Sequence, residues 1–329
     1  MGIFLRIAGI TLKINQPHFM RRLSSAEKPL LLPFISSVCS SGAITVFIQE
    51  VSPRSVNLVH APLNPFIKSI SSLFPKLPPL PLRKRFNRCI KDICSCLNAR
   101  QAQKMALLFK KEAHRCKIAI SRDILIVFNT RLKRCDIFIK RKFRHGKCGA
   151  QYLCALRLLY RLIFDNSLKG IMLHAAGIEL NRGGHAFVGK TGIGKTTAAR
   201  LAEPDRILSD DTVLIRKIRG KYMLFPNPWW NASDLANLKH VRKPVPLKAI
   251  WFIKRGTKTI ARKFRYKEAL AYFIYQDSSF QQTGFFDTKL GIANFFISIG
   301  DLAKIIPVFG LEIKKGPRFR TEFRRFITK

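Results

Sequence analysis

A glycine-rich run in the second half of the chain has the residue types and spacing of a phosphate-binding loop. Residues 189–196 read Gly-Lys-Thr-Gly-Ile-Gly-Lys-Thr and match GxxxxGK[ST] at every fixed position. The apolar segment HAFVG leads into the run, and the helix-like stretch TAARLAEP follows it, which is the strand–loop–helix context that such a loop requires. Glycines let backbone N–H groups turn inward around phosphate oxygens, and the start of the helix adds its N-terminal dipole.

Three side chains at the end of the run could act on bound phosphates. Lys195 would place a cation on the β- and γ-phosphates, the Thr196 hydroxyl could ligate Mg²⁺, and Thr197 could assist through its hydroxyl. The predicted nucleotide-binding residues are Gly189, Lys190, Thr191, Gly192, Ile193, Gly194, Lys195, Thr196 and Thr197. This pattern predicts binding of a nucleoside triphosphate, ATP with Mg²⁺, but it does not name the reaction.

Two adjacent acids follow the loop at short range. Asp210 lies 15 residues after Lys195, and with Asp211 it interrupts the apolar stretch ILSDDTVLI. One carboxylate of such a pair could hold Mg²⁺, directly or through water, and the other could accept a proton from an attacking hydroxyl. The alternative is structural, with one Asp capping a turn and the other pairing with a Lys. We favour the catalytic interpretation, because buried acids need a partner.

The loop, one helix and a double Asp at this spacing resemble the HPr kinase/phosphorylase family and the nucleotide site of phosphoenolpyruvate carboxykinase. The stretch from Gly170 to Leu214 is similar to uncharacterised HPr-kinase-like proteins in particular. The segments that carry this resemblance are Leu173-His174-Ala175-Ala176-Gly177 and Leu208-Ser209-Asp210-Asp211, on either side of the loop.

The resemblance implies a fold and a set of roles. It implies an α/β fold, with a mixed-sheet P-loop kinase core preceded by a strand-rich N-terminal region. Asp210 would match the proton-handling Asp of the family, Asp211 would match its metal-side Asp with Thr196 as the other ligand, and His174 would match a His near the phosphates. The implied activity is ATP-dependent transfer of a γ-phosphoryl group to a hydroxyl, a Ser of a small protein or peptide.

The chain also departs from the family pattern. HPr kinase proper carries a Glu-Ile-Arg-Gly-Leu-Gly signature that supplies a further acidic group, and this sequence has no such run. The resemblance therefore does not extend to HPr as the substrate or to a phosphorylase activity. The additional metal-binding residues of the carboxykinases are not recognisable either, which argues against a decarboxylating activity.

The chain is strongly basic along its whole length. It has 60 Lys and Arg against 19 Asp and Glu in 329 residues, a net charge of +41, and the excess is spread over both halves. Such a charge would attract polyanions nonspecifically. A composition bias that exchanges acids for bases everywhere is the alternative. The 47% of hydrophobic residues can fill a sizeable core, which excludes global disorder.

Signals for a membrane or for secretion are weak. The uncharged stretch 29–49 is long enough to span a bilayer, but Pro29, Pro33 and a Ser/Gly cluster interrupt it. We expect two buried strands around a loop there, and a cytoplasmic protein with free cysteines. An oligomer is compatible with the sequence.

The chain divides into two predicted parts. Residues 1–148 form a strand-rich accessory region with a Pro-rich loop near 64–85 and a possible helix at 86–111, and 149–329 form the P-loop domain. Strands are expected over 6–14, 117–120, 124–128 and 136–140, and a helix over 150–164. In the second part, IMLHAAGIEL is expected to form a strand pair, and residues around 218–221 are expected to form a hairpin. KAIWFI and IIPVFGLEI are expected to be strands, and 267–274 and 288–299 are expected to be helices. The C-terminus is expected to be a basic tail.

Three further aromatic or titratable positions have structural interpretations. We expect His185 to be structural, and Trp229 and Trp230 to pack against the core, although exposed rings there could stack on a base or clamp a peptide.

Two functions compete with that of a kinase. One is an ATP-binding regulator without transfer activity, which the missing signature favours. The other is a nucleic-acid-associated NTPase, which the net charge of +41 suggests.

Overall fold

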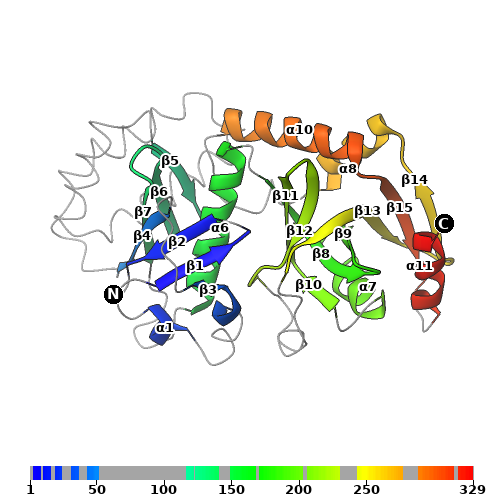
Figure 1. The fold of residues 1–329 in the computed structure, drawn as a ribbon, viewed down its shortest axis with the longest axis horizontal. Coiled ribbons are helices and arrows are strands. Elements are labelled where there is room, and N and C mark those ends of the chain that lie inside the picture. Colours follow the sequence, from blue (N-terminus) through cyan, green and yellow to red (C-terminus); the bar gives the residue numbers. More distant parts are fainter. Residues whose placement is uncertain are drawn as a thin grey trace.

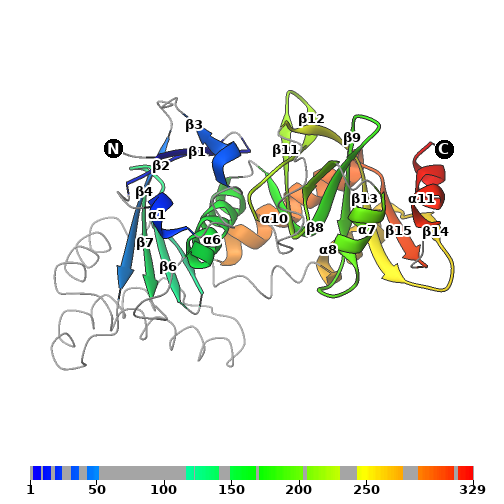
Figure 2. The ribbon, with the colours of Figure 1, turned by 90° about the horizontal axis from the view of Figure 1, so that it is seen from below.

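The computed structural model of the chain is an α/β protein with two mixed β-sheets (Figure 1). It describes residues 3–8, 10–15, 19–23, 31–36, 43–51, 116–121, 123–140, 149–167, 170–202, 206–229, 243–276, 288–314 and 318–328. The first sheet comes from the N-terminal half of the chain and the second from the residues after 170, and the helix α6 lies between them (Figures 1 and 2).

The first sheet has seven strands in the order β3-β1-β2-β4-β7-β6-β5. Its strands are β1 (Ile3–Ile7), β2 (Ile10–Ile14), β3 (Ile35–Ser36), β4 (Ile44–Val51), β5 (Cys116–Ile120), β6 (Ile124–Asn129) and β7 (Arg134–Lys140), with the short helices α1 (Phe19–Arg22) and η1 (Leu32–Phe34) between β2 and β3. The β4 strand is parallel to both β2 and β7, whereas the other pairs are antiparallel.

The second sheet has eight strands and carries the predicted phosphate loop. Its strands are β8 (Ile171–Leu180), β9 (Gly183–Val188), β10 (Ile207–Ser209), β11 (Thr212–Ile218), β12 (Lys221–Phe225), β13 (Val245–Arg255), β14 (Ile260–Lys263) and β15 (Val308–Ile313). The order is β10-β8-β11-β12-β13-β15-β14, and β9 pairs with both β8 and β13. Because β9, β13 and β15 are parallel, their carboxyl ends lie at one edge of the sheet.

Four helices cover the two faces of the second sheet. Apolar side chains of α7 (Lys195–Ala202) and α11 (Phe319–Thr328) share one core cluster with one face of β13. Those of α8 (Tyr266–Gln276) and α10 (Thr288–Ile305) share another cluster with the opposite face. Alternating strand residues point to opposite faces, so Trp251 and Ile253 join the first cluster while Ile250 and Phe252 join the second.

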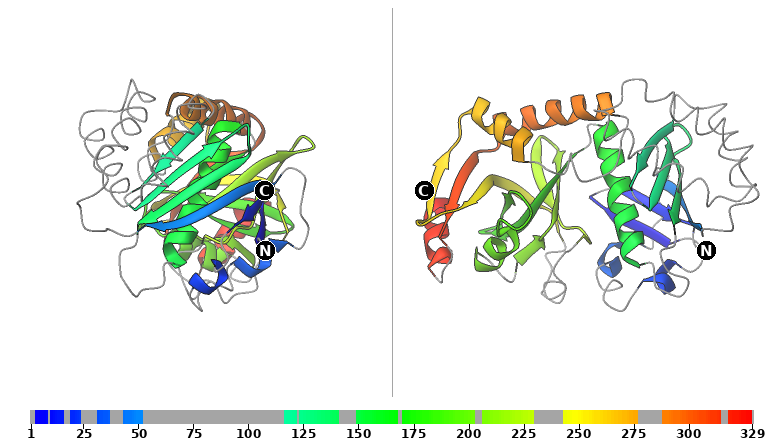
Figure 3. Two further views of the ribbon diagram at one scale, coloured as in Figure 1. Left: turned by 90° about the vertical axis from the view of Figure 1, so that its left-hand side faces the viewer. Right: turned by 180° about the vertical axis from the view of Figure 1, so that it is seen from behind.

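Helix α6 (Gly149–Ser167) connects the two sheets physically. The helix lies against the first sheet (Figure 3). Its buried residues at three- and four-residue spacing, among them Leu156, Leu159 and Tyr160, pack into the core of that sheet. The Tyr160 hydroxyl donates to Ile10 O at 3.0 Å, and Arg161 donates to Met172 O on β8 at 2.9 Å. These contacts join the first sheet to β8, the strand that pairs with β9, which leads into the phosphate loop.

Several predicted elements are confirmed by the structure. The helix over 150–164 is α6, the helices over 267–274 and 288–299 are α8 and α10, and residues 197–202 of the stretch TAARLAEP belong to α7. The predicted hairpin is β11–β12, whose turn residues Arg219 and Gly220 both have positive φ, as a tight two-residue hairpin turn requires. The strands predicted over 117–120, 124–128 and 136–140 lie in β5, β6 and β7.

Three predictions about elements were wrong. Residues 171–180 form one strand, β8, which pairs with β11 through its first half and with β9 through its second. Residues 6–14 belong to two antiparallel strands, because the chain turns at Ala8, where φ is 50°. The basic C-terminal tail is the helix α11, whose Phe323 is buried against Phe187 and Trp251.

Some predicted segments lie outside the described residues. These are the Pro-rich loop near 64–85, the helix at 86–111 and the central part of the uncharged stretch 29–49. On the described sides of that stretch lie the strands β3 and β4. β4 has buried residues, as expected, whereas Ile35 of β3 is 38% exposed, so the prediction that both strands are buried was wrong for β3. Among the described residues, no helix has the length and hydropathy to cross a bilayer.

His185, a buried histidine of β9, should make the stability of the fold depend on pH. Its Nδ1 accepts a hydrogen bond from Trp251 Nε1 at 3.2 Å, and burial, together with the charge of Lys248, lowers the pKa of His185 from 6.5 to about 4. The unfolded chain therefore takes up a proton below pH 6.5 that the folded chain resists. The free energy of unfolding should fall as pH drops from 6.5 to 4, by at most about 1.4 kcal/mol per pH unit.

Urea unfolding of the parent protein and of His185→Gln, at neutral pH and at about pH 4.5, measures this effect. The Gln amide oxygen can still accept from Trp251 but does not titrate in this range, so the variant should lose less stability on acidification. An equal loss in both proteins would contradict the assignment.

Candidate functional site

The predicted phosphate loop connects β9 to α7 directly. Strand β9 ends at Val188, residues 189–194 form the loop, and α7 begins at Lys195. Gly192 and Gly194 have φ of 79° and 109°, a region that other residues rarely adopt, so the backbone path itself requires glycine at both positions. The sequence prediction of a strand, a glycine loop and a helix in this order is confirmed by these elements.

Neighbouring side chains hold the loop against the sheet. A Cβ on Gly189 would lie 2.9 Å from Ile193 Cγ2 and 3.2 Å from Ile253 Cγ1, so only glycine permits this close approach to β13. Arg255, at the end of β13, donates to Gly192 O at 2.8 Å. The loop is therefore supported from the β13 side, and sequence reasoning did not identify Arg255 as a contributor.

Lys195 is almost completely buried at the start of α7. Its side chain is 6% exposed, and its Nζ donates to Gly189 O at 2.9 Å and to Lys190 O at 3.1 Å. The same Nζ lies 3.0 Å from His174 Nε2. Burial lowers the pKa of Lys195 to about 8, although the charges of Asp211 and Asp210 act in the opposite direction. In this state the ammonium group binds the carbonyls of its own loop.

His174 bridges the lysine and the acidic pair. Its Nδ1 lies 3.0 Å from the backbone oxygen of Asp211 and 3.2 Å from Asp211 Oδ1, and its Nε2 lies 3.3 Å from Thr191 Oγ1 as well as beside Lys195. The tautomer with the proton on Nδ1 satisfies all of these contacts, since Nδ1 then donates to Asp211 and Nε2 accepts from Lys195. Pairing of Thr212 with His174 across β11 and β8 sets this alignment.

Asp211 accepts hydrogen bonds on both carboxylate oxygens. Its Oδ2 lies 2.6 Å from Arg157 Nη1 and 3.3 Å from Thr212 Oγ1, while Oδ1 faces His174. Burial alone would raise the pKa of Asp211, but the hydrogen bond from His174 and the charge of Arg157 outweigh burial and lower it. Asp211 is therefore held as a carboxylate between two donors of different elements.

Asp210 and Asp211 lie at the break between two strands. Strand β10 ends at Ser209 and β11 begins at Thr212, and the Ser209 hydroxyl accepts from Thr212 N at 3.3 Å across the break. Asn227 donates to Thr212 O at 2.6 Å. Asp210 is 1% exposed, and its backbone oxygen accepts from the Thr196 hydroxyl at 3.4 Å. The pair thus faces the first turn of α7 from the β8–β11 side.

The smaller predictions have clear outcomes in the described residues. Trp229 is buried, its Nε1 donates to Leu153 O at 3.1 Å, and its ring packs edge-on against Tyr160, so it is a core residue. His185 is also buried in the core. Trp230 lies outside the described residues.

Sequence reasoning missed Arg157 entirely. Arg157 and Arg161 stand four residues apart in the otherwise apolar stretch of α6, so both project from the same side of the helix. That spacing was a signal, because charged residues on a mostly buried helix need partners. It does not identify Asp211 as the partner, which lies 54 residues away in the sequence.

The donor set at the loop suits a triphosphate with a hard cation. The loop offers backbone N–H groups at a helix start, and the nearby Thr196 hydroxyl and two Asp side chains are oxygen donors, the type that Mg²⁺ prefers. Among the described residues, no group of three or more His, Cys, Asp or Glu side chains has an arrangement that could by itself hold a metal ion.

A protein-family model described as SynChlorMet cassette protein ScmC matches residues 152–328. The chain belongs to the ScmC family. The matched residues include the phosphate loop, the acidic pair, His174 and Arg157. The description names no reaction, and the resemblance to HPr kinase stays a prediction.

One solved structure with some similarity is the HPr(Ser) kinase/phosphatase from Coxiella burnetii. It is 10% identical, with a TM-score of 0.28, over 48% of this chain and 88% of that chain. A TM-score of 0.28 does not establish a common fold. No match to this chain is found among curated proteins.

The ion pair between Arg157 and Asp211 should contribute measurably to stability. Arg157→Ala removes the guanidinium from a carboxylate that is 5% exposed, and an unpaired buried charge is costly, so the free energy of unfolding should fall by about 1–3 kcal/mol. A double-mutant cycle with Asp211→Asn, followed by urea unfolding, isolates the pair from other effects.

Arg206→Ala is a matched control for this cycle. Arg206 pairs with Glu179 at 3.4 Å, but its side chain is 56% exposed, so its removal should cost less than about 1 kcal/mol. If the costs of Arg157→Ala and Asp211→Asn simply add, the two side chains do not stabilise each other.

Proposed function

We propose that this chain binds ATP with Mg²⁺ on residues 189–197 and transfers the γ-phosphoryl group to a hydroxyl, a serine of a small protein or peptide. The observation that supports this most strongly is the buried Lys195, whose Nζ lies 3.0 Å from His174 Nε2 while His174 Nδ1 lies 3.2 Å from Asp211 Oδ1. A lysine ammonium that can bind phosphate, next to buried carboxylates, is the combination that phosphoryl transfer needs.

Each side chain has a distinct role in this proposal. Lys195 leaves the carbonyls of Gly189 and Lys190 and binds the β- and γ-phosphates, and the loop N–H groups bind the phosphate oxygens. Asp210 accepts the proton of the acceptor hydroxyl as its oxygen forms a bond to the γ-phosphorus and the bond to ADP breaks. His174 is a positioning residue that keeps Lys195 and Asp211 in register.

Mg²⁺, when bound, would neutralise charge that develops on the phosphate oxygens, with Thr196 and Asp211 as its protein ligands. Asp211 Oδ2 accepts from Arg157 Nη1 at 2.6 Å, so Arg157 would keep this carboxylate charged and oriented for a cation at the loop.

The ion pair between Arg157 and Asp211 also supports a second function, an ATP-dependent regulator without transfer activity, in which a nucleotide on the loop would draw Asp211 away from Arg157. Arg157 belongs to α6, and α6 packs into the core of the first sheet. Freeing its guanidinium would alter the contact of α6 with the second sheet, so occupancy of the loop would be communicated to the N-terminal half. A regulator of this kind needs no acceptor site.

Lys195→Ala should weaken ATP binding at least tenfold, because the phosphates lose their buried cation. Isothermal titration calorimetry with Mg·ATP measures this change. Lys304→Ala is the control, since Lys304 is 63% exposed on α10 and pairs only with Asp301 at 3.6 Å among the described residues. Equal affinity in the parent and in Lys195→Ala would rule out phosphate binding by this lysine.

Asp210→Asn should separate the two functions. If Asp210 accepts the acceptor proton, label transfer from γ-labelled ATP to serine peptides should fall by about 10²–10⁴-fold while ATP still binds. Asp301→Asn, an exposed acid on α10, is the matched control. Bound ATP whose label never leaves, in either protein, favours the regulator.

A further inference from the structure

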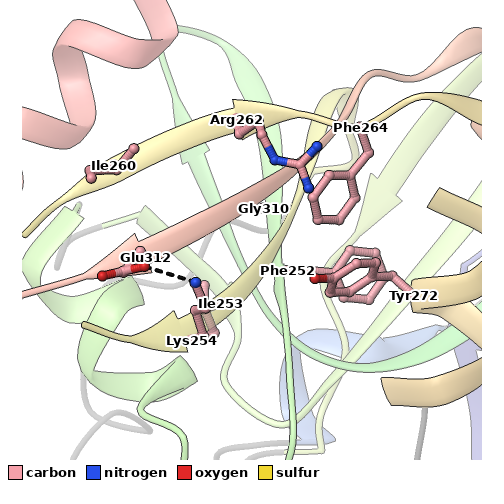
Figure 4. A pocket seen from close by; sticks show the side chains of 9 residues that line it. All are labelled: Phe252, Ile253, Lys254, Ile260, Arg262, Phe264, Tyr272, Gly310 and Glu312. Atoms are coloured by element: carbon pink, nitrogen blue, oxygen red, sulfur yellow. Dashed lines mark ion pairs between the residues drawn. The ribbon is translucent and has the colours of Figure 1, made fainter. Parts of the chain in front are cut away.

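A pocket lies beside the phosphate loop, on the face of the second sheet that α8 covers. It has a volume of about 210 Å³. Its lining comes from β13, β14, β15, α8 and the connection between β14 and α8. The lining residues are Phe252, Ile253, Lys254, Ile260, Arg262, Phe264, Tyr272, Gly310 and Glu312 (Figure 4). Neither the glycine loop nor the acidic pair contributes to this lining.

The pocket shares the edge of the sheet with the phosphate loop. Phe252 of β13 pairs with Val188, the last residue of β9 before the loop, and β15 runs parallel on the other side of β13. Ile253 lines the pocket and also lies against Gly189, 3.2 Å from its Cβ position. Ligands of parallel sheets bind at the carboxyl ends of the strands, where both features lie.

The pocket and the acidic pair lie on opposite sides of β9. His174 belongs to β8 and Asp211 to the break before β11, while the pocket belongs to β13, β15, β14 and α8. A nucleotide whose terminal phosphate faces the acids would therefore direct its other end toward the pocket. Lys190 connects the two regions, since its Nζ lies 5.2 Å from the ring centroid of Tyr275 on α8.

Aromatic rings form one end of the pocket. The rings of Phe264 and Tyr272 have centroids 4.3 Å apart, and Phe252 lies 5.5 Å from Tyr272. The guanidinium of Arg262 lies 4.9 Å from the centroid of Phe264. Gly310 makes this arrangement possible, because a Cβ there would lie 2.6 Å from the Phe264 ring.

Charged groups form the other end. Lys254 Nζ and Glu312 Oε2 are 2.8 Å apart, and Figure 4 shows the two side chains pointing toward one another across the pocket. They offer a carboxylate acceptor and an ammonium donor beside an aromatic surface. This combination suits a flat, aromatic heterocycle with an amino group on its edge.

We propose that this pocket binds the base of the nucleotide whose phosphates occupy residues 189–197. The inference rests on the proposed function, because it requires a nucleotide on the loop. The base packs against the Tyr272 and Phe264 rings, and Glu312 accepts a hydrogen bond from its exocyclic amino group. The residues of the pocket therefore determine selectivity for the base, and the loop determines affinity for the phosphates.

The test compares ATP with inorganic tripolyphosphate, which has phosphates but no base. Calorimetric titrations of both ligands, with Mg²⁺, are made on the parent protein and on Tyr272→Ala. Stacking on an aromatic side chain contributes enough that ATP affinity should fall about tenfold, while tripolyphosphate affinity stays the same. Ile274→Ala, an exposed position on the same helix, is the matched control and should change neither affinity.

A second variant keeps the test decisive if Tyr272→Ala destabilises the core. Ile260 is half-exposed at the rim of the pocket, and Ile260→Trp should fill the pocket and block the base without removing a buried group. Ile260→Trp should also weaken the binding of ATP while the binding of tripolyphosphate stays the same. Thermal unfolding of each variant confirms that the fold is intact.

The outcomes separate this inference from the proposed function. Selective loss of ATP affinity in the pocket variants supports it. Equal effects on both ligands, or a parent protein that binds ATP no more tightly than tripolyphosphate, overturn the base pocket while phosphate binding by the loop survives. A parent protein that binds neither ligand overturns the proposed function and the base pocket together.

Discussion

The need to satisfy buried charge is the constraint on which the site depends. The Lys195 ammonium and the Asp211 carboxylate are both largely removed from water, where a charge is tolerated only with partners. His174 connects the two groups and Arg157 neutralises the carboxylate. These four side chains come from α7, the β10–β11 break, β8 and α6. The contacts that these two charged groups need therefore fix the relative positions of four elements. A ligand that displaces one of the partners must itself contact the charged group that loses it.

Chemically different groups lie side by side along the edge of the second sheet where the parallel strands β9, β13 and β15 end. The side toward β8 carries buried acids, the middle carries the glycine loop, and the side toward β15 carries aromatic rings. A nucleotide has the complementary order, with a charged end and a flat apolar end. The proposed phosphate and base sites follow from this match. Arg255, which ends β13 and donates to Gly192 O, connects the loop to the pocket strand.

Local sequence patterns were sufficient to predict most helices and strands, but they did not predict which strands pair with one another. The spacing of Leu156, Leu159 and Tyr160 indicates a helix, because helical periodicity depends only on nearby residues. An apolar run such as 171–180 does not show whether the chain turns within it, and here one strand serves three neighbours, β11, β9 and β10. The C-terminal helix was hidden by its basic composition, although Phe319, Phe323 and Phe326 recur at helical spacing.

The sequence by itself determined the phosphate loop and the acidic pair, since a glycine backbone path and the start of a helix are specified by adjacent residues. Tertiary structure decided how these groups are paired. Arg157 reaches Asp211 only because α6 packs between the two sheets, and the pocket forms only where β13, β14, β15 and α8 meet. Contacts between residues far apart in the chain depend on how whole elements pack, and no local pattern records that packing.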